Sequence, residues 1–118
     1  MTEKELIAQL ERNIKSECKS YITENHEWNL NGLPVDVTKI DSVKVKFDEF
    51  DLDIVALVNG EDLILNANIS VDGFIKKPNG AKGCFIDFTL RNFTATYDKE
   101  TELFFFKGFS DLSITDMS

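Results

Sequence analysis

The sequence predicts an α+β fold, in which an N-terminal helix packs on a curved antiparallel meander of about four long, bulged strands. Three observations carry this prediction. Apolar residues recur every three or four positions over residues 2–24, and they recur at every second position from residue 43 onward. Asn59 and Gly60 form the dipeptide most typical of a tight β-hairpin. With 118 residues and no linker or internal repeat, the chain is expected to be a single domain, residues 1–118.

Residues 2–24 are expected to form one amphipathic helix. Thr2 and Glu5 match a capping box, in which each side chain satisfies a backbone amide at the helix start. Charged residues fall mostly on one face, and Asn25 is expected to end the helix. The other face carries the apolar residues Leu6, Ile7, Leu10, Ile14, Cys18, Tyr21 and Ile22. Such a helix needs an apolar surface to pack on.

Residues 25–41 are expected to form an irregular connection between the helix and the sheet. Gly32 and Pro34 interrupt regular backbone structure. A short strand at residues 35–37 is compatible with this interpretation. The apolar residues that would anchor the connection to the core are Trp28, Leu30 and Leu33.

Residues 42–115 are expected to form the antiparallel sheet. Apolar side chains alternate along four segments, which are separated by the Asn59-Gly60 turn, a polar loop at 76–83 and a tight turn at 98–101. Each strand would hold about 14 residues and span about 46 Å, which is long enough for the sheet to bend. In element order alone, this arrangement resembles cystatin-like and related helix-plus-sheet rolls.

Four shifts in the alternation predict β-bulges. The apolar period steps by three residues instead of two at residues 47–50, 71–74, 90–93 and 106–109. One inserted residue keeps the apolar side chains on the same face of the sheet after such a step, and it also bends the strand. The bulges are therefore expected at residues 48–49, 72–73, 91–92 and 107–108. The alternative is a set of separate short strands with bends between them.

The same alternation assigns side chains to the two faces of the sheet. The helix-facing set is Phe50, Leu52, Ile54, Leu65, Ala67, Ile69, Phe88, Leu90, Phe93, Phe104 and Phe106. The opposite face would carry polar residues together with six apolar ones: Val55, Leu57, Ile64, Phe85, Leu103 and Phe105. These six predict an exposed apolar patch that binds a partner protein or a second copy. The alternative is that residues 25–41 cover them, with Trp28 on top.

The charge balance limits the kinds of partner. The 21 acidic and 13 basic residues give a net charge of −8, which argues against direct binding to nucleic acid because its phosphates are also negative. The carboxylates of Asp48, Glu49, Asp51 and Asp53 predict an acidic face that docks a basic protein surface. The alternative is a solvated face that prevents aggregation. A D-x-D pair alone is too little to predict a Mg²⁺ site.

The remaining titratable residues predict no enzyme. The lone His26 lies near no telling nucleophile and no second ligand, so no catalytic residue, metal or cofactor is expected. The N-terminus predicts neither a secretory leader nor a membrane span, and hence a cytoplasmic protein. Cys18 and Cys84 are then expected as reduced thiols, with a disulfide as the alternative. The basic residues of segment 76–91 predict either an anion contact or a protected hairpin tip.

These observations lead to three hypotheses about function. The leading one is a non-enzymatic acidic interaction module, such as an inhibitor or immunity-type protein that docks the basic surface of a nucleic-acid-handling enzyme or toxin. The second is a roll with an apolar cavity that binds a small molecule or acts as a small enzyme. The polar groups of that cavity would be Tyr21, His26, Trp28 and Tyr97. The third is a homo-oligomeric structural subunit held through the face that carries Phe105.

Overall fold

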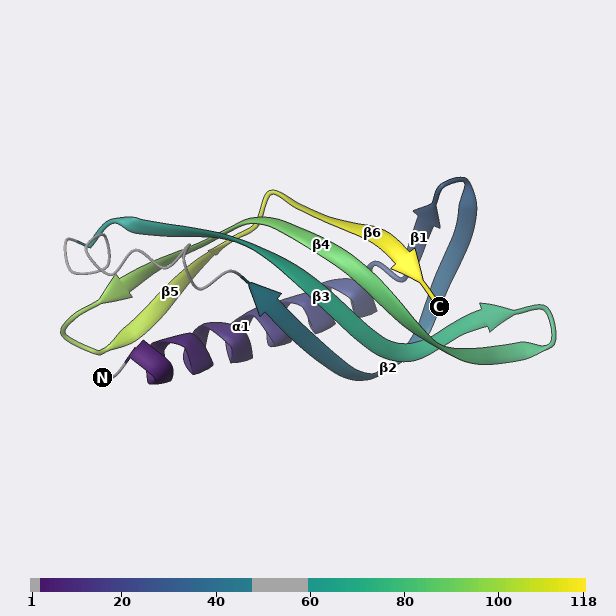
Figure 1. Cartoon of the computed structure of the whole chain (residues 1–118), viewed down its shortest axis with the longest axis horizontal. Coiled ribbons are helices and arrows are strands. Elements are labelled where there is room, and N and C mark those ends of the chain that lie inside the picture. Colours follow the sequence, from purple (N-terminus) through teal and green to yellow (C-terminus); the bar gives the residue numbers. More distant parts are fainter. Residues whose placement is uncertain (1–2, 48–59) are drawn as a thin grey trace.

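A computed structural model of the chain describes residues 3–47 and 60–118 (Figure 1). One helix, α1 (Glu3–Glu24), lies along the inner side of a curved antiparallel sheet, which confirms the predicted α+β class. Thr2, the first residue of the predicted capping box, lies outside the described residues. At the other end, the backbone N–H and the side-chain amide of Asn25 both donate to the carbonyl of Tyr21, so the helix stops where it was predicted to stop.

The sheet of the described residues has six strands rather than about four. They are β1 (Glu27–Leu30), β2 (Leu33–Phe47), β3 (Asp62–Lys77), β4 (Gly80–Asp98), β5 (Leu103–Gly108) and β6 (Asp111–Met117). Neighbours in the sheet follow the order β1-β2-β3-β4-β5. The strand β6 pairs with residues 86–91 of β4, and β5 pairs with residues 94–98 of the same strand. All pairings are antiparallel, so the predicted meander is confirmed.

Two regions differ from the sequence prediction. Residues 25–41 are not an irregular connection, because β1 and the first part of β2 form a hairpin there. Asn31 and Gly32 both have positive φ, 51° and 87°, as a type I′ turn requires. This is the same dipeptide signal that predicted a turn at residues 59–60. The predicted last strand, 102–115, is instead two strands, and both of them lie along β4 (Figure 1).

The positions of the bulges match the prediction at two of the three sites that can be compared. Between β3 and β4 the register shifts opposite residues 91–92, and Asn92 there has a φ of 55°. Between β4 and β5 the register skips Lys107, next to the predicted break. The predicted bulge at 72–73 is wrong, since the extra residues are Thr38 and Asp41 of β2 and β3 itself continues without a break. The predicted bulge at 48–49 lies outside the described residues.

The core lies between α1 and the inner face of the sheet. The buried helix residues include Leu10, Ile14, Cys18 and Ile22, all fully inaccessible to solvent. From the predicted helix-facing set, the buried residues are Leu65, Ala67, Ile69, Phe88, Leu90, Phe93 and Phe104, while Phe106 is half-buried. Phe50, Leu52 and Ile54 of that set lie outside the described residues. The prediction of the sheet faces is therefore confirmed wherever the structure describes them.

The molecule is elongated, measuring 53 × 23 × 22 Å. Its radius of gyration of 15.8 Å exceeds the value of about 13 Å expected for a compact chain of this length. The N-terminus and the β4–β5 turn lie at one end, and the tip of the β3–β4 hairpin lies at the other (Figure 1).

Candidate interaction surfaces

Six of the ten predicted binding residues cannot be placed, and the other four are exposed. Asp48, Glu49, Asp51, Asp53, Val55 and Leu57 lie outside the described residues. Ile64, Phe85, Leu103 and Phe105 have between 54% and 63% of their surface exposed. The alternative that residues 25–41 cover these side chains is wrong. Trp28 packs on the inner side of the sheet instead, edge-to-face against Phe88 with ring centroids 4.9 Å apart.

The four exposed apolar side chains do not form one patch. Phe105 pairs with Thr96 of β4, and Ile64 of β3 pairs with Thr94, so these two lie near each other on the outer face. Phe85 lies nine residues before Thr94 along β4, which separates it by roughly 30 Å at ~3.3 Å per residue. It pairs with Asp72 and exchanges backbone hydrogen bonds with Ser118. The sequence could not show this, because alternation gives the face of a residue but not its neighbours across strands.

Carboxylates surround the three apolar residues that remain together. We call Ile64, Leu103 and Phe105, with the charged residues near them on β3, β4, β5 and the β4–β5 turn, the acidic-apolar end. The acidic members are Glu61, Asp62, Asp98, Glu100 and Glu102, and the basic members are Lys99 and Lys107. The start of β3, the end of β4 and the whole of β5 bring these residues to the same end of the sheet (Figure 1).

The side chain of Asp62 is fixed within this end. Lys107 Nζ lies 3.0 Å from both carboxylate oxygens of Asp62, and the Thr96 hydroxyl donates to one of them. The hydrogen bond from Thr96, followed by that from Lys107, lowers the pKa of Asp62 below its usual value. These three residues lie on three adjacent strands, so they tie β3, β4 and β5 together beside Phe105.

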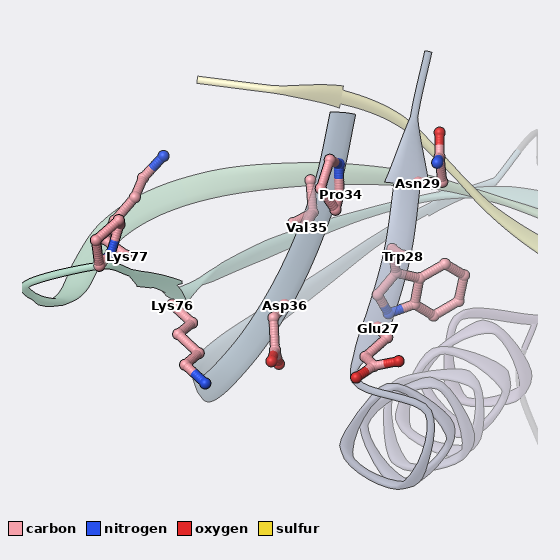
Figure 2. A pocket seen from close by; sticks show the side chains of 9 residues that line it. Glu27, Trp28, Asn29, Pro34, Val35, Asp36, Lys76 and Lys77 are labelled. Atoms are coloured by element: carbon pink, nitrogen blue, oxygen red, sulfur yellow. The ribbon is translucent and has the colours of Figure 1, made fainter. Parts of the chain in front are cut away.

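A cleft lies at the opposite end of the molecule, between the β1–β2 and β3–β4 hairpins (Figure 2). Its volume is about 780 Å³. One wall carries Glu27, Trp28, Asn29, Pro34, Val35 and Asp36, and the other carries Lys76, Lys77 and Pro78. The predicted polar loop at residues 76–83 is shorter than expected, because strand pairing continues to Lys77 and Gly80. The basic hairpin tip thus forms one wall of a cleft.

His26 lies at the edge of this cleft, beside two carboxylates. Its Nδ1 atom is 2.8 Å from Oδ1 of Asp36, and Glu27 stands directly opposite Asp36 across the hairpin. One donor atom from each of the three residues lies within 4.8 Å of the other two. Sequence reasoning missed this cluster. A hairpin at Asn31-Gly32 would have paired Glu27 with Asp36, but the segment was expected to be irregular.

The polar groups proposed for a cavity between helix and sheet do not come together. The ring of Tyr21 contacts Trp28 and Phe109, at centroid distances of 6.2 and 5.1 Å. Tyr97 packs against Phe104, beside the acidic-apolar end. Tyr97 is therefore far along β4 from the Trp28–Phe88 contact, and a single site that uses both residues is wrong.

Both cysteines are free and buried, as the prediction of reduced thiols requires. Burial, assisted by the nearby charge of Glu17, raises the pKa of Cys18 to about 12. Burial also raises the pKa of Cys84, although Lys82 and Lys77 act in the opposite direction. Neither thiol has the lowered pKa that nucleophilic cysteines show.

No helix in the described part of the chain combines the length and the apolar character that crossing a membrane requires. No family model matches the chain, and no curated protein or solved structure is significantly similar to it.

Proposed function

We propose that this protein is a non-enzymatic interaction module whose acidic-apolar end docks on the basic surface of a partner protein. One observation carries the proposal: Ile64, Leu103 and Phe105 are more than half exposed on one face of the sheet, with carboxylates near them at the start of β3 and in the β4–β5 turn. Large apolar side chains gathered on a surface are typical of protein-binding sites. Surrounding carboxylates favour a partner of opposite charge.

The charge of the whole chain supports a partner with a basic surface. At −8, the protein attracts positively charged surfaces over a distance of about one Debye length. Nucleic-acid-handling enzymes and toxins carry such surfaces, because they bind phosphates. An acidic protein that occupies such a surface would block access of the nucleic acid, so we propose that the module acts as an inhibitor or immunity-type protein.

A pull-down from the native host tests this proposal with matched variants. Phe105→Ser removes the central apolar side chain of the acidic-apolar end. Phe85→Ser is the control, because it removes an equally exposed side chain from the same face at the other end. We expect wild type and Phe85→Ser to retain the same basic protein and Phe105→Ser to lose it. The captured protein should be lost at about 1 M salt, where the Debye length is about 3 Å, and retained at about 0.01 M salt.

Two results would contradict the proposal. The first is equal retention by Phe105→Ser and Phe85→Ser, which would place the binding site elsewhere. The second is retention of the partner that does not depend on salt, which would show that charge attraction does not contribute to binding. The double variant Asp51→Asn, Asp53→Asn tests separately whether the acidic face predicted from the sequence contributes to the same docking.

A further inference from the structure

The cleft between the two hairpins has walls of opposite charge. The β1–β2 wall carries the acidic residues Glu27 and Asp36, and the β3–β4 wall carries the basic residues Lys76 and Lys77. Within the described residues no ion pair joins these walls, although they face the same space. Figure 2 shows Lys76 extending on the same side of the hairpin as the Asp36 carboxylate, and Lys77 extending away from it. The charges of the cleft are thus left to interact with something that enters it.

The two carboxylates of the first wall are held close together by the strand register. Glu27 and Asp36 are direct partners across the antiparallel pair, so both side chains project from the same face. Like charges in this position repel each other and destabilise the pair. His26 fixes one of them, since its Nδ1 lies 2.8 Å from Asp36. A positively charged group placed between the carboxylates would relieve the repulsion.

The space between the walls suits a ligand larger than an ion. A volume of about 780 Å³ lies within the range of about 300–1,000 Å³ that is usual for small-molecule sites. In liquid water, roughly 26 molecules at ~30 Å³ each would occupy this volume. Pro34 and Pro78 add apolar surface beside the charged groups, and Asn29 adds an amide. The cleft therefore offers a site for a cation at one wall, a site for an anion at the other, and apolar contact between them.

We propose that this cleft binds short peptides with free termini. The α-ammonium group is bound by Glu27 and Asp36, the terminal carboxylate is bound by Lys76, and an intervening side chain contacts Pro34 and Pro78. The volume of about 780 Å³ leaves room for a peptide of a few residues. This site is at the opposite end of the molecule from the acidic-apolar end, so the inference does not depend on the proposed docking function.

Titration of the isotope-labelled protein with defined tripeptides, followed by NMR, tests the inference. The probes are Ala-Val-Ala and Ala-Phe-Ala with free termini, each compared with its N-acetylated and C-amidated forms, in the presence of EDTA. We expect the free peptides to shift the amide resonances of Val35, Asp36 and Lys77. Each blocked form should bind at least about tenfold more weakly, because it lacks one charged contact.

Variants separate this site from general charge attraction. Glu27→Gln and Lys76→Gln should each weaken binding of the free peptides by about tenfold or more. The controls Asp41→Asn and Lys82→Gln remove the same charges from β2 and from the β3–β4 hairpin, at positions that do not line the cleft. They should leave the affinity unchanged.

Three results would overturn the inference. They are equal binding of free and blocked peptides, equal loss in the cleft variants and the controls, or no shift with any probe at millimolar concentration. Binding of Zn²⁺ alone to His26, Glu27 and Asp36 without EDTA, combined with no peptide binding, would likewise replace it with a metal site. None of these outcomes bears on the pull-down with Phe105→Ser, so the two proposals fail separately.

Discussion

At Gly73 the backbone of β3 lies close to the backbone of β2. A Cβ atom at this position would lie 2.3 Å from the backbone carbonyl oxygen of Lys39, which is closer than any real contact. The bulges at Thr38 and Asp41 lie on either side of that carbonyl in β2. Bulges bend a strand, and here they lie where the β2 backbone comes close to Gly73.

Gly73→Ala is therefore expected to destabilise the protein by about 2 kcal/mol, because backbone atoms must move to admit the methyl group. Chemical denaturation measures the change in the free energy of unfolding. Gly83→Ala is the matched control, since a Cβ there would meet only the Phe74 ring at 3.4 Å. We expect that variant to stay within about 0.5 kcal/mol of wild type. Equal losses of stability in the two variants would show that the nearby Lys39 carbonyl is not the reason why position 73 needs glycine.

The buried thiol of Cys18 should make stability depend on pH in the alkaline range. Its folded-state pKa of about 12 exceeds the ordinary value of 9.0, so the unfolded chain loses its proton first as the pH rises. The stabilisation is complete below pH 9.0 and is lost between pH 9.0 and about 12. We expect denaturation midpoints to fall more steeply over this range in wild type than in Cys18→Ala. At pH 8, Cys18 should react with a thiol reagent only after unfolding. Rapid labelling of the folded protein would contradict its burial.

Gln9 joins the helix to the sheet by a contact between elements far apart in the chain. It is the buried polar residue of α1, and its Oε1 accepts a hydrogen bond of 2.9 Å from the backbone N–H of Phe104 in β5. Its Nε2 lies 3.5 Å from the carbonyl of Glu102, in the turn before β5. This contact places the first half of the helix against the strand that carries Phe105.

Gln9→Ala leaves the buried N–H of Phe104 without its acceptor, and we expect it to cost about 1–3 kcal/mol of stability. Thermal and chemical denaturation measure the loss. Arg12→Ala, an exposed position on the same helix, is the control and should change stability by less than about 0.5 kcal/mol. Hydrogen exchange should be faster in β5 of Gln9→Ala, and unchanged exchange there would argue against a link between the two elements.

The bulges show how far an element can be predicted from its own residues. Two breaks, at residues 91–92 and 107–108, follow from apolar side chains that change phase within one strand. The bends near Gly73 follow from extra residues in the neighbouring strand β2, where the apolar residues also step by three, from Val37 to Ile40 and from Ile40 to Val43. These steps were not expected to mark bulges, because residues 25–41 were predicted to be irregular. At Asn92 the backbone N–H donates to the side chain of Asn66 on β3, so this bulge is also held from across the sheet.

At the scale of the whole molecule, one end is mainly acidic, and the other carries both the carboxylates of Glu27 and Asp36 and a basic hairpin tip. Carboxylates dominate the acidic-apolar end, and Lys76, Lys77 and Lys82 lie on the hairpin at the other end. Two copies that met through Phe105 would bring two acidic ends together, which is unfavourable. The proposed docking to a basic partner therefore predicts that the chain does not associate with itself through this face.

Sedimentation equilibrium is expected to give the mass of a monomer, 13.4 kDa, at low salt. Charge repulsion is strongest there, because the Debye length is about 30 Å at about 0.01 M salt. Phe105→Ser should not change the measured mass. A dimer in wild type that Phe105→Ser dissociates would contradict this prediction, and it would favour the homo-oligomeric subunit instead.

The sequence by itself determined the helix, the antiparallel sheet and the face on which the apolar residues of β3, β4 and β5 lie, because these follow from the period of side chains along one segment. It did not place Leu33, which was expected to anchor residues 25–41 to the core and is 52% exposed beside the β1–β2 turn. It also contained the Asn31-Gly32 turn that pairs Glu27 with Asp36. Only the tertiary structure decided which residues of one face become neighbours: it kept Phe105 near Ile64, moved Phe85 to the far end and brought Lys76 opposite Asp36. These relations depend on strand register and on the bend of the sheet, which are set by contacts between segments far apart in the chain.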